Sequence, residues 1–318
     1  ILPTIMYYMD EPLSNPSAMQ LYFLSKGTRE HVKVALSGEG ADEFFGGYNT
    51  YLEAGPFERY QKWVPGFVRK GLAKAVENLP RFHGQRFLVR GAQPLSERYY
   101  RVNYVYNYHE REKILKDKSL NVDTGAYTKH IFDEVKDKDE MTQMQYFDIN
   151  TWLPFDILQK ADRMSMANSL EVRTPLVDRE VAKFAATMPI KTRIQGDTTK
   201  ISLRKAAQAE LPEKVANKEK LGFPSPVAQW MKEPKYKKMI EDAFTSDVAK
   251  KFFDTDALLE IFKEHLNGKS SMQKIFTIYT FILWYQVYFP EDCEHDIRDQ
   301  IRFNNVKAHA NEQNFAEA

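Results

Sequence analysis

The sequence predicts an α/β fold in which helices predominate and one short strand carries the ligand site. Residues 32–36 (Val-Lys-Val-Ala-Leu) alternate branched apolar residues with others, as a short strand does. A turn rich in glycine and acidic residues follows directly. Residues 51–139 then read as helices broken by prolines and glycines. A strand that ends in such a turn is the layout of a ligand site in an open α/β sheet.

The turn after this strand reads Ser-Gly-Glu-Gly-Ala-Asp-Glu-Phe-Phe-Gly-Gly-Tyr. Gly38 and Gly40 lack a β-carbon, so they permit a tight turn and a close approach of the backbone to a ligand. Glu39, Asp42 and Glu43 crowd three carboxylates together, which requires that they be solvated, paired with cations or bound to a metal. An ordinary polar surface turn explains the composition equally well. Composition alone leaves both interpretations open.

The overall composition narrows the class of protein. A chain of 318 residues can form two ordinary domains or one large one, and its 45 basic and 44 acidic residues give no overall field for nucleic acid or membranes. The single cysteine, Cys293, excludes an intrachain disulfide and fits a reducing cytosol. The most hydrophobic run, residues 275–289, is too short to span a bilayer, and no signal segment is present. We therefore expect a cytoplasmic protein with neither a nucleic-acid nor a membrane partner.

Residues 1–9 form an apolar run, which predicts that the sequence begins within a β-sheet. Asp10-Glu11-Pro12 ends this run, since proline cannot continue a central strand. Ser17 is then expected to cap a helix over residues 18–29.

Basic and apolar side chains alternate irregularly along residues 57–74. The basic ones alone would suggest an RNA-binding face. The apolar ones recur at helical spacing, which predicts a solvated basic face over a buried apolar stripe. The basic residues are Arg59, Lys62, Arg69, Lys70 and Lys74, and the apolar ones are Phe57, Trp63, Phe67 and Leu72.

A second informative block covers residues 148–178. Pro154 lies near a helix start, and an apolar stripe that includes Ala161 and Met164 predicts a core-facing side. Pro175 forces the chain out of the helix. Four charged side chains in this block are expected to form a buried ion network that holds the helix against the ligand site, since such networks outnumber catalytic groups. They are Asp162, Glu171, Arg173 and Asp178.

A third block covers residues 196–230. Lys200 begins a helix that Leu211-Pro212 stops, and Lys220 stands on a stiff loop before Gly222-Phe223-Pro224. In isolation, a loop lysine is most often simply exposed to solvent. Two further helices are predicted at 254–266 and 271–289, and the polar residues 291–318 have the profile of a mobile tail.

The three blocks together resemble the glutamine-hydrolysing asparagine synthetases over residues 1–289. The glycine-rich turn resembles the second signature of that family. The strings Lys-Ala-Asp-Arg-Met-Ser-Met-Ala (160–167) and Leu-Glu-Val-Arg-x-Pro-Leu-x-Asp (170–178) match it almost residue for residue. The loop before Phe223 resembles the loop that supplies a lysine to pyrophosphate, although Lys218 stands where arginine is common. The resemblance implies an α/β fold of the adenine-nucleotide α-hydrolase-like, ATP-pyrophosphatase type, of which this chain holds a mostly helical part with a remnant of the parallel sheet.

The resemblance also implies a reaction. ATP adenylates the side-chain carboxylate of aspartate, and ammonia delivered from glutamine then forms asparagine. By resemblance, Ser37 and Gly38 contact the nucleotide, and Asp42 helps to hold Mg²⁺ and pyrophosphate. Lys220 stabilises the departing pyrophosphate, and Glu39 lies beside the reacting carboxylate.

The same resemblance predicts the domain organisation. Residues 1–290 correspond to the carboxyl-terminal part of the synthetase domain, with a residual sheet and nucleotide-site turn at 1–52 and a helical part at 53–290. Residues 291–318 form the charged tail. The chain begins with Ile1 instead of a glutaminase cysteine and has no Ser-Gly-Gly-x-Asp-Ser pyrophosphate loop. We therefore expect a missing upstream part of the same polypeptide and no activity in the isolated chain.

Three questions stay open at this point. A related ATP-dependent amide-forming enzyme, similar to β-lactam synthetase, shares the implied fold, although the Gly-Glu-Gly turn with Glu39 favours the asparagine enzyme. A non-catalytic helical assembly domain would explain the missing loop. The resemblance also leaves a homodimer open.

Overall fold

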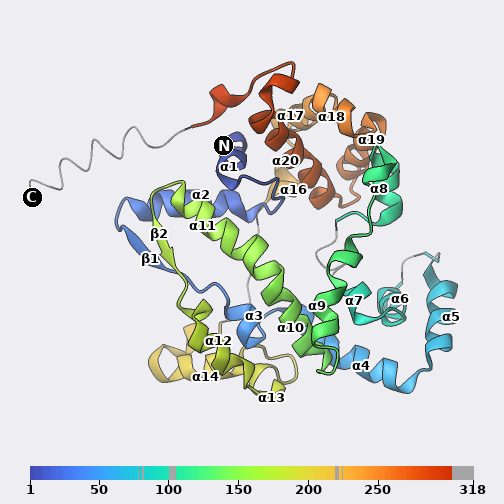
Figure 1. The fold of residues 1–318 in the computed structure, drawn as a ribbon, viewed down its shortest axis with the longest axis vertical. Coiled ribbons are helices and arrows are strands. Elements are labelled where there is room, and N and C mark those ends of the chain that lie inside the picture. Colours follow the sequence, from blue (N-terminus) through green and yellow to red (C-terminus); the bar gives the residue numbers. More distant parts are fainter. Residues whose placement is uncertain (78, 81, 100–104, 219–221, 224, 303–318) are drawn as a thin grey trace, which may run out of the picture.

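The computed structural model describes residues 1–77, 79–80, 82–99, 105–218, 222–223 and 225–302. Over these residues helices predominate, and two three-residue strands, β1 (Val34–Leu36) and β2 (Glu171–Arg173), form a parallel sheet. Their register pairs Ala35 with Val172. The sheet lies at one side of the molecule, and the helices occupy the rest (Figure 1). The predicted combination of many helices with a small parallel sheet is confirmed.

The helices follow one another along the chain with short connections. Those of the first half are α1 (Leu2–Met9), α2 (Ser17–Arg29), α3 (Ala41–Phe45), α4 (Ala54–Trp63), α5 (Gly66–Glu77), α6 (Gln85–Gly91), α7 (Leu95–Arg98), α8 (Tyr108–Ile114), α9 (Lys129–Glu134), α10 (Glu140–Asn150) and α11 (Gln159–Met166). Those of the second half are α12 (Arg179–Ala186), α13 (Ile190–Arg193), α14 (Ile201–Glu210), α15 (Glu213–Ala216), α16 (Val227–Trp230), α17 (Pro234–Phe244), α18 (Asp247–Phe252), α19 (Thr255–Leu266) and α20 (Met272–Tyr288).

The main hydrophobic core lies where α20 packs against α1, α17, α18 and α19. Ile5, Leu258 and Ile282 are fully buried there, and burial of one such side chain stabilises the fold by about 1.5–3 kcal/mol. The helices predicted at 254–266 and 271–289 are confirmed as α19 and α20. In the described part of the chain, no helix has both the length and the apolar character required to cross a membrane.

The prediction of a sheet at residues 1–9 is wrong, because this run forms α1. Ile5, Met6 and Met9 are buried on one face, but the exposed side carries Tyr7, which is also apolar, so the sequence shows no clean period. A short apolar run of this kind does not distinguish a strand from a buried helix. The helix over 18–29 is confirmed as α2, but Ser17 does not cap it. Ser17 is the first helical residue, and its backbone N–H donates to the side chain of Asn15 (3.1 Å).

The predicted buried ion network is also wrong. Arg173 pairs with Glu171 at 2.8 Å with both side chains more than half exposed. Asp162 is exposed, and Asp178 accepts the backbone N–H of Glu180 (2.8 Å) as the N-cap of α12. These charges stay in water because β2 carries no covering layer over the described residues.

A different ion pair is buried in this block. Lys160 donates to Asp156 at 2.7 Å, with side chains 5% and 10% exposed. The Asn15 amide donates to the same carboxylate at 2.8 Å. Because an unpaired buried charge is very costly, this three-residue cluster ties the π-helical turn Leu153–Leu158 and α11 to the segment before α2.

Two further predictions differ from the structure. The mobile tail was expected from residue 291, but Ile297 and Ile301 are buried in the main core and the backbone N–H of Arg302 donates to Thr4 Oγ1 (2.9 Å). Residues 303–318 lie outside the described residues. The buried stripe expected at 57–74 includes only Phe57, since Trp63 and Phe67 are 78% and 80% exposed.

A second, smaller core surrounds a buried carboxylate on α10. The hydroxyls of Tyr51 and Tyr99 both donate to Asp148 Oδ2, each at 2.6 Å. Burial raises the pKa of Asp148 to about 7, although the two tyrosine hydrogen bonds oppose the shift. The folded protein therefore keeps this proton over a range in which the unfolded chain has released it.

This proton makes stability depend on pH. Between about pH 4, where an unfolded aspartate ionises, and about pH 7, the folded state binds one proton more than the unfolded state. The free energy of unfolding should therefore fall as pH rises through this window. Asp148→Asn cannot ionise, so its stability relative to wild type should improve by up to about 1.4 kcal/mol per pH unit. Urea unfolding at successive pH values measures this difference. Asp133→Asn, which replaces an exposed aspartate, is the control, and its free energy of unfolding should change with pH as that of wild type does. If the free energy of unfolding of Asp148→Asn also changed with pH as that of wild type does, the raised pKa of Asp148 would be contradicted.

Candidate active site

The glycine-rich turn leaves the sheet at the carboxyl end of β1. The backbone N–H of Ser37 donates to Arg173 O (2.8 Å), so strand pairing continues one residue beyond β1. Gly40 then adopts φ +85°, and a β-carbon there would lie 2.7 Å from Val177 Cγ2. Gly38 has open space around its α-carbon and no positive φ. The backbone therefore requires glycine at position 40, whereas close approach of a ligand at Gly38 stays a prediction.

An ion pair closes the turn from the other side. Asp42 on α3 lies 3.0 Å from Lys200 Nζ, and both side chains are less than one-fifth exposed. The pair passes directly over Gly47: a β-carbon at that position would lie 2.0 Å from Lys200 Cε and 2.1 Å from Asp42 Oδ1. Gly47 N–H also donates to Asp42 O (2.8 Å). The carboxylate and the ammonium group therefore meet directly against the second glycine of the Gly-Gly pair, where a β-carbon would not fit.

Lys200 reaches this position through an unusual backbone conformation. It is the N-cap of α14 with φ +53°, in the left-handed region that residues other than glycine rarely adopt. Such strain persists only where the surroundings impose it, and it is concentrated at functional sites. Lys200 lies at the start of a helix, as the sequence predicts, but its contact with Asp42 was not predicted, because no local pattern connects two residues so far apart in the chain.

The three carboxylates of the turn diverge instead of forming one cluster. Glu43 points inward and is 1% exposed, whereas Glu39 is half-buried and Asp42 faces Lys200. Tyr48 donates to Glu43 Oε1 (2.6 Å), and Trp152 Nε1 donates to the Tyr48 hydroxyl (3.1 Å). Burial raises the pKa of Glu43, the Tyr48 hydrogen bond lowers it, and the nearby Asp42 and Glu39 add to the rise. Glu43 therefore anchors α3, whereas Glu39 and Asp42 each keep part of their surface exposed.

The donor set at the turn suits a metal that is shared with phosphate. Among the described residues, no group of three or more His, Cys, Asp or Glu side chains converges to hold a metal ion. Mg²⁺ in nucleotide sites typically uses only one or two carboxylates and completes its octahedral shell with phosphate oxygens and water. Asp42, next to a lysine at the end of a strand, fits that second arrangement.

The position of Lys220 is not described, since residues 219–221 and 224 lie outside the described residues. The chain that leads into this loop is anchored to α14, where Arg204 donates to Lys218 O (2.8 Å) and Ala216 O (3.3 Å). The helix that begins with Lys200 therefore also holds the entrance of the loop. The assignment of Lys220 to the site stays a prediction.

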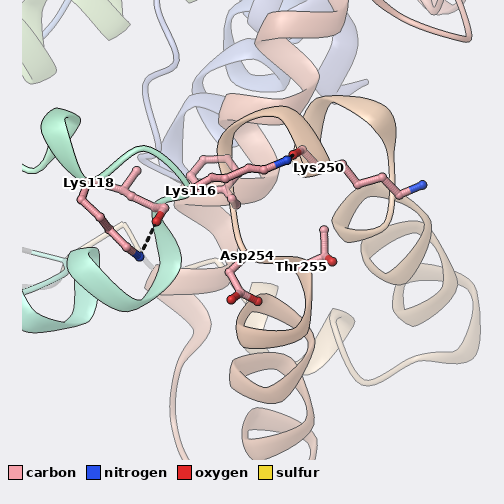
Figure 2. Close-up of a pocket in the computed structure, with 7 residues that line it drawn as sticks. Lys116, Lys118, Lys250, Asp254 and Thr255 are labelled. Carbon is pink, nitrogen blue, oxygen red and sulfur yellow. Dashed lines mark hydrogen bonds between the residues drawn. The ribbon is translucent and has the colours of Figure 1, made fainter.

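The pocket in Figure 2 lies elsewhere, between residues 115–118 and the start of α19. It encloses about 360 Å³ and is lined by Lys116, Lys118 and Lys250. Lys116 Nζ donates to Lys250 O (2.8 Å), and Lys118 Nζ donates to Leu115 O (2.7 Å). Backbone carbonyls therefore hold both ammonium groups, and Lys116 joins the two segments, whereas Lys118 stays within its own. The pocket is separate from the acidic turn.

Taken together, these features define an α/β protein in which a carboxylate and an ammonium group are held side by side beyond the carboxyl end of a parallel strand. A family model described as asparagine synthase matches residues 1–286. The chain therefore belongs to the asparagine synthase family, as its sequence motifs predicted.

Curated relatives agree with this assignment. "Asparagine synthetase [glutamine-hydrolyzing] 1" of Bacillus subtilis (strain 168) is 37% identical over 310 residues, which cover 94% of this chain and 48% of the relative. "Putative asparagine synthetase [glutamine-hydrolyzing]" of Mycobacterium tuberculosis (strain ATCC 25618 / H37Rv) is 35% identical over 305 residues, which cover 94% of this chain and 46% of the relative. "Amidase chry2" of Gibberella zeae is more distant, at 22% over 306 residues. The chain spans about half the length of the curated relatives that it matches.

The packing over Gly47 gives a direct test of the site geometry. Gly47→Ala inserts a β-carbon between Lys200 and Asp42, and overpacking of this kind typically costs about 1–3 kcal/mol of stability. Gly71→Ala in α5 is the matched control: nothing lies within 4 Å of its added β-carbon, and alanine is favoured over glycine within a helix. Urea unfolding of both variants measures the costs. Equal stability of the Gly47→Ala variant and wild type would show that the two side chains do not meet over this glycine.

Proposed function

We propose that this chain contributes the acidic turn and its lysine partner to a cytoplasmic glutamine-dependent asparagine synthetase. In the proposed reaction, ATP and aspartate give an acyl-adenylate and pyrophosphate, and ammonia from glutamine converts the acyl-adenylate into asparagine and AMP. The observation that carries the proposal is the Asp42–Lys200 pair at the carboxyl end of β1, within a chain of the asparagine synthase family. The proposed complete fold is of the ATP-pyrophosphatase type.

The chemistry explains why the site needs both charges. The side-chain carboxylate of aspartate is a poor electrophile until adenylation gives it a good leaving group. Attack on the α-phosphorus requires that the charge of the departing pyrophosphate be neutralised. Mg²⁺, when bound with the nucleotide, supplies part of this neutralisation, and Asp42 is the residue that would hold it. Ser37 and Gly38, at the end of β1, would lie against the nucleotide.

The lysines supply the remaining positive charge. Lys200 is already held beside Asp42 at 3.0 Å, so its ammonium group needs no large movement to meet a phosphate oxygen near that carboxylate. Such preorganised charge is effective because no reorganisation is required when the bond breaks. Lys220, whose loop begins next to the Arg204 anchor, would approach the same phosphates. Glu39, half-buried in the turn, would accept a proton from the attacking ammonia.

An assay of the product of the complete coding sequence tests this function. With aspartate, ATP, glutamine and Mg²⁺, we expect asparagine, AMP and pyrophosphate in equal amounts. Omission of aspartate should abolish pyrophosphate release. Pyrophosphate release that depends on a different carboxylic acid would instead favour another ATP-dependent amide-forming enzyme, similar to β-lactam synthetase. If the expressed protein neither binds ATP nor releases pyrophosphate, a non-catalytic role as a helical assembly domain would be favoured.

Replacement of Lys220 tests its role in the same enzyme. Lys220→Ala should slow ATP–pyrophosphate exchange by about 10²–10³ while leaving the affinity for ATP within a few fold, because the lysine acts on charge that grows as the bond breaks. Lys214→Ala, an exposed lysine on the neighbouring α15, is the control and should retain the wild-type rate. An unchanged exchange rate in the Lys220→Ala enzyme would remove this residue from the site.

A further inference from the structure

Residues 59–90 form a local concentration of positive charge that the balanced composition conceals. This stretch, which we name the basic hairpin, contains eight lysine or arginine residues and a single acidic residue, Glu77, whereas the whole chain has a net charge of only +1. It comprises the end of α4, then α5 and α6. Arg90 is paired with Glu53, just outside this stretch, at 2.6 Å, so the other basic residues are the ones that would attract an anionic surface.

The basic hairpin also exposes large apolar side chains. Trp63 and Phe67 are 78% and 80% exposed, and Leu79 and Phe82 are 52% and 45% exposed. None of the 12 residues of α5 is buried. Phe67, Lys70 and Lys74 recur at a spacing that places them on one face of α5, while Val68 and Val76 on the other side are half-buried. The outer face of α5 therefore combines an aromatic ring with two long basic side chains.

This exposure is not a sign of a loosely held segment. Phe57 stacks on Phe87 at 4.7 Å between ring centroids, which fixes α6 to α4. Arg69 donates to Gly91 O (3.1 Å), and Gln85 Nε2 donates to Val76 O (2.6 Å), which fix α5 to α6. The hairpin is therefore held firmly with its aromatic and basic side chains outward. Figure 1 shows α5 at the margin of the molecule, on the opposite side from β1 and β2.

We propose that the basic hairpin is a docking surface for anionic lipid membranes. Tryptophan and phenylalanine insert at the boundary between headgroups and acyl chains, and lysines extend their apolar stems while their ammonium groups contact lipid phosphates. A nucleic-acid surface is less well matched. Bases stack on aromatic rings, but the exposed aliphatic Leu72 and Leu79 have no counterpart in such binding. Because α5 is short and amphipathic, the attachment is peripheral and reversible.

Vesicle sedimentation with the protein expressed from the complete coding sequence tests the proposal, because any upstream segment that covers the basic hairpin is then present. The protein should sediment with phosphatidylcholine vesicles that contain phosphatidylglycerol, should remain in solution with phosphatidylcholine alone, and should dissociate as salt is added. Lys70→Ala with Lys74→Ala should weaken partitioning roughly thirtyfold, which follows from removal of two lysines near the surface. Trp63→Ala with Phe67→Ala should weaken it at least about tenfold.

The controls separate this surface from general charge effects. Lys129→Ala with Lys232→Ala removes two exposed lysines from other helical regions and should leave partitioning within about twofold of wild type. Circular dichroism checks that each variant is folded, and the replaced side chains are exposed. Equal binding to neutral and anionic vesicles, or equal losses in the control and hairpin variants, would overturn the proposal. Binding to a polyuridylate RNA without binding to either vesicle would overturn it in favour of a nucleic-acid surface.

Discussion

The contact between Asp42 and Lys200 over Gly47 is the constraint on which the rest of the site depends. It joins α3, which follows β1, to the amino-terminal end of α14. Gly47 has to be glycine so that the two side chains can meet, and Lys200 has to adopt a left-handed backbone so that its ammonium group points at the turn. A pair this well shielded gives up much of its hydration, so its attraction is largely offset by desolvation. Its main consequence is therefore the placement of two opposite charges at the end of a strand, where the proposed nucleotide would lie.

The same turn shows how burial divides similar side chains among different roles. Glu43 is buried beneath Tyr48 and Trp152 and fixes α3, whereas Glu39 and Asp42 are only partly buried. Deeper in the same core, Asp148 accepts two tyrosine hydroxyls and holds α10 against the segment that follows the turn. The acidic turn is thus supported by a shell of satisfied hydrogen bonds. Rigid support of this kind would keep the site within the small tolerances that the proposed adenylation demands.

Local patterns predicted much of this structure, and long-range contacts account for the remainder. The strand, the glycine-rich turn and the helices α2, α14, α19 and α20 follow from periodicity and from proline and glycine positions. The sequence could not show that residues 1–9 are helical, because the exposed side of this run carries apolar side chains such as Tyr7 and hides the helical period. Within residues 148–178, the buried ion pair proved to be Asp156–Lys160, since burial of a charge depends on which elements cover it. For the same reason, nothing in the sequence connected Lys200 with Asp42, and Trp63 and Phe67 were expected inside but lie outside.

Hydrogen–deuterium exchange of the complete enzyme, with and without ATP and Mg²⁺, tests the location of the nucleotide site most directly. The nucleotide should slow exchange of the backbone amides in residues 37–47 and 198–206, which lie on the two sides of the Asp42–Lys200 contact. Amides of α19, beside the separate pocket of Figure 2, should exchange at unchanged rates. Protection confined to α19, with no change at residues 37–47, would show that the nucleotide binds elsewhere.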